Sequence, residues 1–183
     1  MSDELVVRCC APTLAGMKTG SIFSCPYDSE RELFSQVRDL DRRLSPRGLR
    51  ALLLRWRRGK ALLYVFRPAM LRRDLRGDAA QRLLCERGYA GMGCEACLTR
   101  LIRQLWQSED FPHEIGLFLS YPPEDVRGFM EDRACGYKLI GYWKVYGDVE
   151  QARRTFERYK KCTDCFCRSL KAGMPLAELA VAG

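Results

Sequence analysis

Two apolar segments joined by four polar residues constrain the fold of this chain more than any other feature. Residues 49–56 and 61–67 have strand-like periodicity, and RRGK at 57–60 connects them. A short connection that contains glycine, between two such segments, is typical of a β-hairpin. Period two predicts one shared face on each strand, made of Leu52, Leu54 and Trp56 on the first and Leu62, Tyr64 and Phe66 on the second.

Helices and two further strands are expected around this hairpin. The strands are 21–25 and the aromatic segment YKLIGYWKVY at 137–146. A capping box at Ser29 to Glu32 is expected to start a helix with Leu33, Val37, Leu40 and Leu44 on one face. The other expected helices are 5–14 (or an extended segment there), 69–75, 78–86, 95–106, 122–132, 148–173 and 175–181.

This order predicts an α+β fold. We expect a small, mostly antiparallel sheet of about four strands packed with helices, ferredoxin-like (split βαβ) with a helical insertion. A chain of 183 residues is expected to form a single domain, 1–183, in which 69–136 is the insertion and contains HEIGLFLSYPPEDV.

Composition narrows the class of protein. With 47% hydrophobic and 30% charged residues, the chain is globular. No apolar run approaches the ~18–20 residues of a membrane span, and the N-terminus lacks the pattern of a signal peptide. We therefore expect a cytoplasmic protein without a membrane segment, whose ten cysteines are mostly thiols.

The only histidine lies in PHEIGLFLSYPPEDVRGF at 112–129. His113 stands beside Glu114, and histidine is the side chain best suited to proton transfer near neutral pH. The alternative is that this segment opens a helix and fills the core.

A second candidate is the segment from Cys10 to Lys18. A cysteine becomes a nucleophile when a nearby cation lowers its pKa, and Lys18 is close in sequence. Lys18 could instead bind an anion together with the backbone amides of Gly16 and Gly20. The alternative is a packed Cys10 and a solvated Lys18.

Three motifs resemble those of an uncharacterised family, a domain of unknown function found mainly in anaerobic Firmicutes. They are CAPTLAGMKTGSIFSCPY at 10–27, PHEIGLFLSYPPEDVRGF at 112–129 and GYWKVYGD at 141–148. The resemblance extends from about residue 10 to residue 173 and implies no established activity. The family usually has histidine where Cys9 stands and glycine where Ser120 stands. The first difference argues against a mechanism that needs a histidine beside Cys10.

Other groups support alternative functions. Two C-x-x-C pairs, Cys94 with Cys97 and Cys162 with Cys165, suit zinc or an iron–sulfur cluster, but about sixty-four residues separate them. Residues 42–76 hold twelve Lys or Arg against one acid, and the hairpin mixes Arg55, Arg57, Arg58, Lys60 and Arg67 with aromatics, as a nucleic-acid surface would. Charged residues also protect a sheet edge, and inward-pointing aromatics argue against nucleic acid.

We therefore expect a thiol-dependent enzyme or a protein that binds a small anionic ligand. The alternatives are a basic module for nucleic acid or an acidic protein, and a cysteine-rich metal or redox protein. No metal or cofactor is assigned, and the oligomeric state is open. The expected site comprises Cys10 as the most reactive thiol, Lys18 as its activator or an anion anchor, His113 as acid/base, Glu114 or Asp125 as the orienting carboxylate, and Thr13, Tyr121 and Lys144 as ligand-binding residues.

Overall fold

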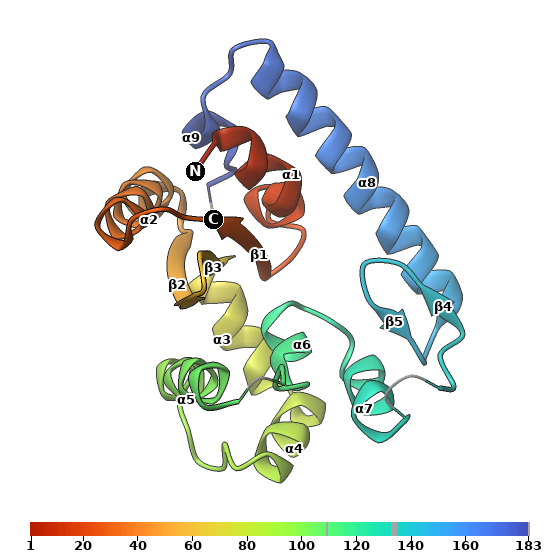
Figure 1. The fold of residues 1–183 in the computed structure, drawn as a ribbon. Coiled ribbons are helices and arrows are strands. Elements are labelled where there is room, and N and C mark those ends of the chain that lie inside the picture. The colour runs from red at the N-terminus through yellow and green to blue at the C-terminus, as the bar shows by residue number, and fades with distance from the viewer. Residues whose placement is uncertain (109, 133–134, 183) are drawn as a thin grey trace. The chain divides into compact units, whose positions relative to one another are not determined.

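The computed structural model describes residues 1–108, 110–132 and 135–182 (Figure 1). The chain forms two compact units. Unit 1 comprises Met1–Met70 and Tyr159–Gly183, and unit 2 comprises Leu71–Arg158. Unit 2 includes most of the expected insertion at 69–136 and continues beyond it. The single-domain organisation of 1–183 stays a prediction.

Unit 1 contains one sheet and the helices packed on it. Its elements are α1 (Asp3–Leu14), β1 (Gly20–Pro26), α2 (Glu30–Leu44), the 3-10 turn η1 (Ser45–Arg47), β2 (Arg50–Arg57), β3 (Lys60–Phe66), the start of α3 (Pro68–Arg76), the end of α8 (Val149–Lys171) and α9 (Leu176–Leu179).

The predicted hairpin is confirmed as β2 and β3. Both central residues of its turn have positive φ, 50° at Arg58 and 72° at Gly59. This is the geometry of a type I′ turn, whose twist matches that of the flanking strands. Strand β1 lies on the other side of β3, and β3 is antiparallel to both neighbours.

The predicted face of Trp56 is wrong. The register of β2 against β3 shifts between Leu53 and Arg55. One extra residue reverses the alternation of side chains beyond it, so Trp56 packs against the same core as Leu53. Its ring meets Phe34 of α2 edge-on, with 5.0 Å between the ring centroids.

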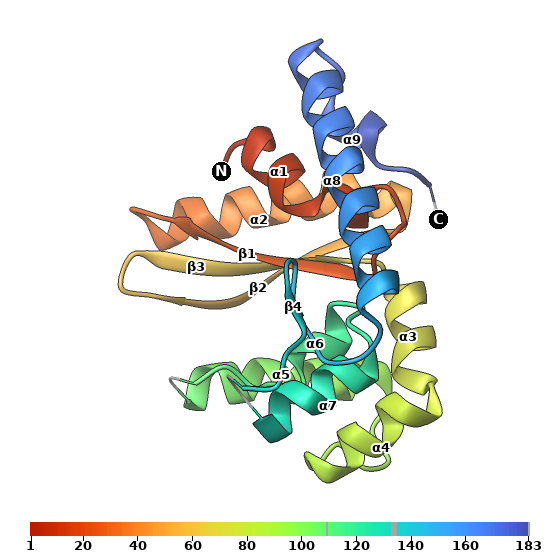
Figure 2. The same cartoon turned by 90° about the vertical axis from the view of Figure 1, so that its right-hand side faces the viewer.

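The core of unit 1 lies where α1 and α2 cover one face of the sheet (Figure 2). The face predicted for α2 is confirmed, because all four of its residues are buried there. The principal contributors are Val6, Val7, Cys10 and Leu14 of α1; Leu33, Val37, Leu40 and Leu44 of α2; Ala51, Ala61, Leu63 and Val65 of the hairpin; and Leu176 and Leu179 of α9.

The predicted capping box at Ser29 is wrong. Ser29 is the N-cap residue of α2, but its side chain makes no capping hydrogen bond. The carboxylate of Glu32 instead accepts a hydrogen bond from Gln36 Nε2 at 2.7 Å. An i,i+4 pair along the helix has therefore replaced the reciprocal cap.

Unit 2 is mostly helical. Its elements are the rest of α3, α4 (Asp78–Glu86), α5 (Cys94–Gln107), α6 (Ile115–Phe118), α7 (Pro123–Asp132), β4 (Leu139–Ile140), β5 (Lys144–Val145) and the start of α8. Asp148 caps α8 as expected, since its Oδ1 accepts the Gln151 N–H at 2.9 Å.

The single strand predicted over 137–146 is wrong, because the segment folds back on itself. Leu139 pairs with Val145, and Ile140 pairs with Lys144. At the turn, a Cβ on Gly141 would lie 2.3 Å from the Phe156 ring, so only glycine permits this approach.

The α+β class is confirmed, with nine helices, a three-strand antiparallel sheet and a two-strand hairpin among the described residues. The predicted fourth strand lies outside the main sheet, and the ferredoxin-like topology is not shown. None of the helices in the described ranges combines the length and apolar character that crossing a membrane requires.

Candidate functional site

The eight candidate residues divide between the two units. Cys10, Thr13 and Lys18 belong to unit 1, and the other five belong to unit 2. Four of those five line one pocket of about 220 Å³ within unit 2: His113, Tyr121, Asp125 and Lys144.

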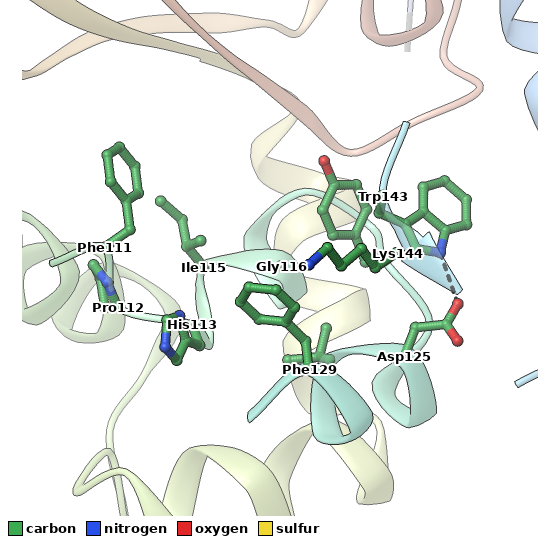
Figure 3. Close-up of a pocket in the computed structure, with 11 residues that line it drawn as sticks. Phe111, Pro112, His113, Ile115, Gly116, Asp125, Phe129, Trp143 and Lys144 are labelled. Atoms are coloured by element: carbon green, nitrogen blue, oxygen red, sulfur yellow. Dashed lines mark hydrogen bonds between the residues drawn. The ribbon is translucent and has the colours of Figure 1, made fainter. Parts of the chain in front are cut away.

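The pocket is formed by the segment that leads into α6, by α7 and by the β4–β5 hairpin (Figure 3). Its wall is largely aromatic and aliphatic. The residues that complete the wall are Phe111, Pro112, Ile115, Gly116, Val126, Phe129 and Trp143. The aromatic members were not predicted as site residues, although Phe129 and Trp143 stand inside two of the motifs that carry the family resemblance.

A tight reversal between α6 and α7 shapes one side of the pocket. The Tyr121 N–H donates to the Gly116 carbonyl at 3.0 Å. Ser120 has a φ of 61°, in the left-handed region that favours glycine, and its Oγ donates to Asp74 Oδ2 at 3.0 Å. A Cβ on Gly116 would lie 2.7 Å from Val126 Cγ2. The packing of α6 on α7 therefore requires glycine at 116.

Asp125 fastens the hairpin segment to α7. Its carboxylate accepts hydrogen bonds from Trp143 Nε1, the Tyr146 N–H and the Gly147 N–H, each at 2.7 Å. Asp125 is 3% exposed. Three N–H donors satisfy the hydrogen-bonding capacity of this buried carboxylate. Asp125 therefore positions Trp143 in the pocket wall, which is a different role from the orientation of His113.

His113 and Glu114 point to different surroundings. The His113 ring meets Phe129 edge-on, with 4.9 Å between centroids. Glu114 is buried and accepts a hydrogen bond from the Tyr89 hydroxyl at 2.9 Å. Burial, and next the charge of Glu114, raise the pKa of Tyr89. Tyr89 was not among the predicted residues, and no sequence motif pointed to it.

Lys144 supplies the cation of the pocket. Its Nζ lies 5.5 Å from the centroid of Phe129 and 5.0 Å from that of Tyr137, within the range of cation–π attraction. On the neighbouring wall, Tyr121 stacks on Trp143 with 5.0 Å between ring centroids. Burial raises the pKa of Tyr121 to about 12, so its hydroxyl stays protonated at neutral pH.

The candidate residues of unit 1 are packed inside it. Cys10 is 0% exposed and Lys18 is 7% exposed. Burial raises the pKa of the Cys10 thiol, and Lys18 only partly opposes this effect. Burial lowers the pKa of Lys18 to about 8. Thr13 Oγ1 shares a buried 2.9 Å hydrogen bond with Ser21 Oγ. This placement opposes a reactive thiolate at Cys10, and the catalytic assignment stays a prediction.

The basic hairpin also contains a residue with an internal role. Arg67 is 4% exposed, and its guanidinium donates to the carbonyls of Thr13, Leu14 and Val181 at 2.8, 2.7 and 2.7 Å. It therefore closes the C-terminal end of α1. Tyr64 and Phe66, the aromatics expected beside it, are buried as well. These residues are unavailable for contact with nucleic acid in this conformation.

The two C-x-x-C pairs lie in different units, Cys94 and Cys97 at the start of α5 and Cys162 and Cys165 within the unit 1 part of α8. All ten cysteines are free thiols. Within the described ranges, no group of three or more His, Cys, Asp or Glu side chains is placed to hold a metal ion.

Comparison with known proteins identifies the family of this chain. No curated protein and no solved structure matches it. The family described as "Protein of unknown function (DUF3793)" matches residues 6–180, a range that includes all three motifs in full. The chain therefore belongs to the DUF3793 family.

Proposed function

We propose that unit 2 binds a small anionic molecule with a flat apolar body in the pocket at His113 and Lys144. The observation that carries the proposal is the convergence of four candidate residues, drawn from two separate motifs, on one cavity.

The size and wall of the pocket specify the body of the ligand. An apolar cavity of about 150 Å³ is enough for benzene, so about 220 Å³ accommodates a single ring with a substituent. Phe129 and Trp143 offer ring faces and edges for stacking. A flat ring is therefore favoured over a branched aliphatic chain.

The polar groups specify the charge of the ligand. Lys144 is the cation of the wall, and His113 brings a ring nitrogen that can donate a hydrogen bond. The carboxylate of Asp125 is already engaged by three N–H donors, which offset its repulsion of an anion. A carboxylate or similar anion on the ligand complements this arrangement.

Binding has stronger support than catalysis. An acid/base histidine is normally oriented by a carboxylate, whereas Glu114 bonds Tyr89 and Asp125 bonds the hairpin segment. Cys10, the expected nucleophile, is buried in unit 1. The thiol-dependent enzyme is therefore the less supported alternative.

The test compares three single-ring probes: benzoate, neutral benzamide and cationic benzylamine. Binding is followed by backbone amide shifts in NMR spectra of the full chain, with Trp143 Nε1 as the reporter of the pocket. We expect benzoate to bind best, and Lys144→Met to weaken it roughly five- to tenfold, as the loss of one partly buried charge contact implies.

Lys160→Met is the matched control, because Lys160 is exposed on α8 in unit 1, and it should leave benzoate binding unchanged. Equal affinity for benzoate and benzamide, an unchanged benzoate affinity in Lys144→Met, or no shift at Trp143 with millimolar benzoate would each contradict the proposal.

A further inference from the structure

A second cavity in unit 2 contains a pair of thiols that the proposed function does not use. It has a volume of about 300 Å³ and is lined by Cys94 and Cys97 of α5 and by Arg72 and Arg76 of α3. The spacing of this C-x-x-C pair suits a metal site, yet no third metal-ligating group stands with it among the described residues. Its setting instead suits thiol chemistry.

The two thiols lie at the same end of the helix. Cys94 is the first residue of α5, and Cys97 stands one turn later. Side chains of a helix tilt toward its N-terminus, and Cys97 Sγ reaches back to within 3.7 Å of the Met92 carbonyl. Residues three apart on a helix have Cβ atoms about 5–6 Å apart, so a small adjustment of the first turn suffices to join the sulfurs.

The two thiols differ in exposure, as a two-step thiol–disulfide exchange requires. Cys94 is half-buried and lines the cavity, whereas Cys97 is 1% exposed. An outer thiol can meet a substrate, and an inner thiol can then attack the outer sulfur. Gly93, at the N-cap position, has no side chain to cover the first turn of α5.

The charges around Cys94 favour an anion. The pKa of the Cys94 thiol is raised overall, because burial is the largest effect. Arg72 lowers this pKa, Glu95 raises it by a smaller amount, and Arg76 lowers it least, so the two arginines partly offset the cost of burial. The partial positive charge at the start of a 14-residue helix also favours a thiolate. The same two arginines present cations to whatever enters the cavity.

The second C-x-x-C pair provides an internal comparison. Cys162 and Cys165 have the same spacing but lie in the interior of the 23-residue α8. Burial, and next the charge of Cys165, raise the pKa of Cys162 to about 11, and no cation appears among the causes. Spacing alone therefore does not distinguish the pairs, whereas their position on the helix and their neighbours do.

We propose that Cys94 and Cys97 form a redox-active dithiol that reduces small disulfides bearing carboxylates. The Cys94 thiolate attacks one sulfur of the substrate disulfide, forms a mixed disulfide and releases the first substrate thiolate. The Cys97 thiolate then attacks Cys94 Sγ, forms the Cys94–Cys97 disulfide and releases the second thiolate. The protein loses two electrons and two protons, and the substrate disulfide gains them as two thiols.

The first experiment treats the fully reduced chain with oxidised glutathione without oxygen, then blocks remaining thiols and digests with trypsin. Cleavage after Arg87 and Arg100 releases a peptide that contains Cys94 and Cys97 as its only cysteines. Cleavage after Lys161 and Arg168 releases Cys162, Cys165 and Cys167 together. We expect the first peptide to lose two hydrogens before the second peptide changes.

The second experiment uses variants. Cys97→Ser should trap a glutathionyl group on Cys94, whereas Cys165→Ser should not change the reaction at Cys94. Arg72→Gln/Arg76→Gln should slow the reaction with oxidised glutathione roughly tenfold more than the reaction with cationic cystamine, because the arginines attract the anion and repel the cation. Arg153→Gln/Arg154→Gln, an exposed pair in unit 2, is the matched control.

The proposal is overturned if the α8 peptide is oxidised first or equally fast, or if Cys97→Ser traps no adduct. It is also overturned if the protein with intact arginines shows no preference for oxidised glutathione over cystamine. That last comparison needs no variant, so it holds even if a substitution disturbs folding.

Discussion

In unit 1, Cys10, Thr13 and Lys18 are buried; in unit 2, His113, Tyr121 and Lys144 line a cavity. Each set contains a lysine, and both stand in motifs of the same family resemblance. The first set satisfies internal packing and hydrogen bonds, whereas the second leaves space for another molecule.

A polar motif can therefore stabilise a fold instead of forming a binding site. In unit 1, the carbonyls at the end of α1 accept hydrogen bonds from the guanidinium of Arg67, and the hydroxyls of Thr13 and Ser21 share a hydrogen bond. Burial decides between the two roles, because a polar group that is already paired inside the protein has little left to offer a ligand.

The largest expected contrast concerns the labelling of thiols. Cys10 should react with iodoacetamide at least about a thousandfold more slowly than exposed Cys165, because its exposure requires an opening that costs on the order of 5 kcal/mol. Mass spectrometry of timed samples measures both rates. A Cys10 rate within tenfold of the Cys165 rate would restore the reactive-thiol hypothesis.

Arg67→Met should destabilise unit 1 by about 3 kcal/mol, because three buried carbonyls lose their donor. Denaturant unfolding measures the change. Arg42→Met, at an exposed position on α2, should change stability by less than about 0.5 kcal/mol. Equal effects of the two substitutions would show that the Arg67 network does not stabilise the fold.

Asp125→Asn should destabilise unit 2 by about 2 kcal/mol, because the amide group faces Trp143 Nε1 or a backbone N–H, donor against donor. Unfolding experiments and the NMR signal of Trp143 Nε1 both report the change. Asp132→Asn, exposed at the end of α7, is the control. An unaltered Trp143 signal would contradict the positioning role.

The buried Lys18 should make stability depend on pH. Its pKa of about 8 lies below the unfolded value, so from about pH 8 to about 10.5 the unfolded state binds more protons and stability rises with pH. Relative to Lys18→Met, the natural protein should gain about 1 kcal/mol between pH 7 and pH 9. The raised pKa of Cys10 acts in the opposite direction above pH 9 but is present in both proteins. If the difference in unfolding free energy between the natural protein and Lys18→Met stays constant with pH, Lys18 is solvated.

The smallest expected effect is at Ser120, whose φ of 61° suits glycine. Ser120→Gly and Ser120→Ala both lose the hydrogen bond to Asp74. The glycine variant should be more stable than the alanine variant by roughly 0.5–1 kcal/mol, because only alanine has a Cβ in the left-handed region. Thermal unfolding of the two variants measures the difference, and the reverse order would show that this turn changes conformation.

Local signals predicted the elements better than their assembly. Alternation and the RRGK turn gave the hairpin, and the spacing of Leu33 and Val37 gave the buried face of α2. The bulge before Arg55 and the reversal at Gly141 were not predicted, because each depends on one residue's fit against a distant segment. The Gly141 contact, for example, requires the ring of Phe156.

The candidate site was predicted in part. His113, Tyr121, Asp125 and Lys144 line one pocket, as their motifs suggested, but the role of Asp125 depends on backbone donors that follow β5. Sequence cannot separate a buried lysine from an exposed one at Lys18 when the covering residues come from elsewhere in the chain. The family resemblance indicated which positions to consider, but only the three-dimensional packing separates the buried candidates from those that line the pocket.

The discontinuity of unit 1 has a consequence for its synthesis. Arg67 and the Val181 carbonyl that it binds are separated by 114 residues. At ~5–20 residues per second, a ribosome needs about 6–23 s to make that stretch. Unit 2 is continuous and is synthesised within this interval, while the strands of unit 1 still lack α9, which contributes Leu176 and Leu179 to their core. The segment that follows unit 2 in the chain thus completes the core of the unit whose strands precede it.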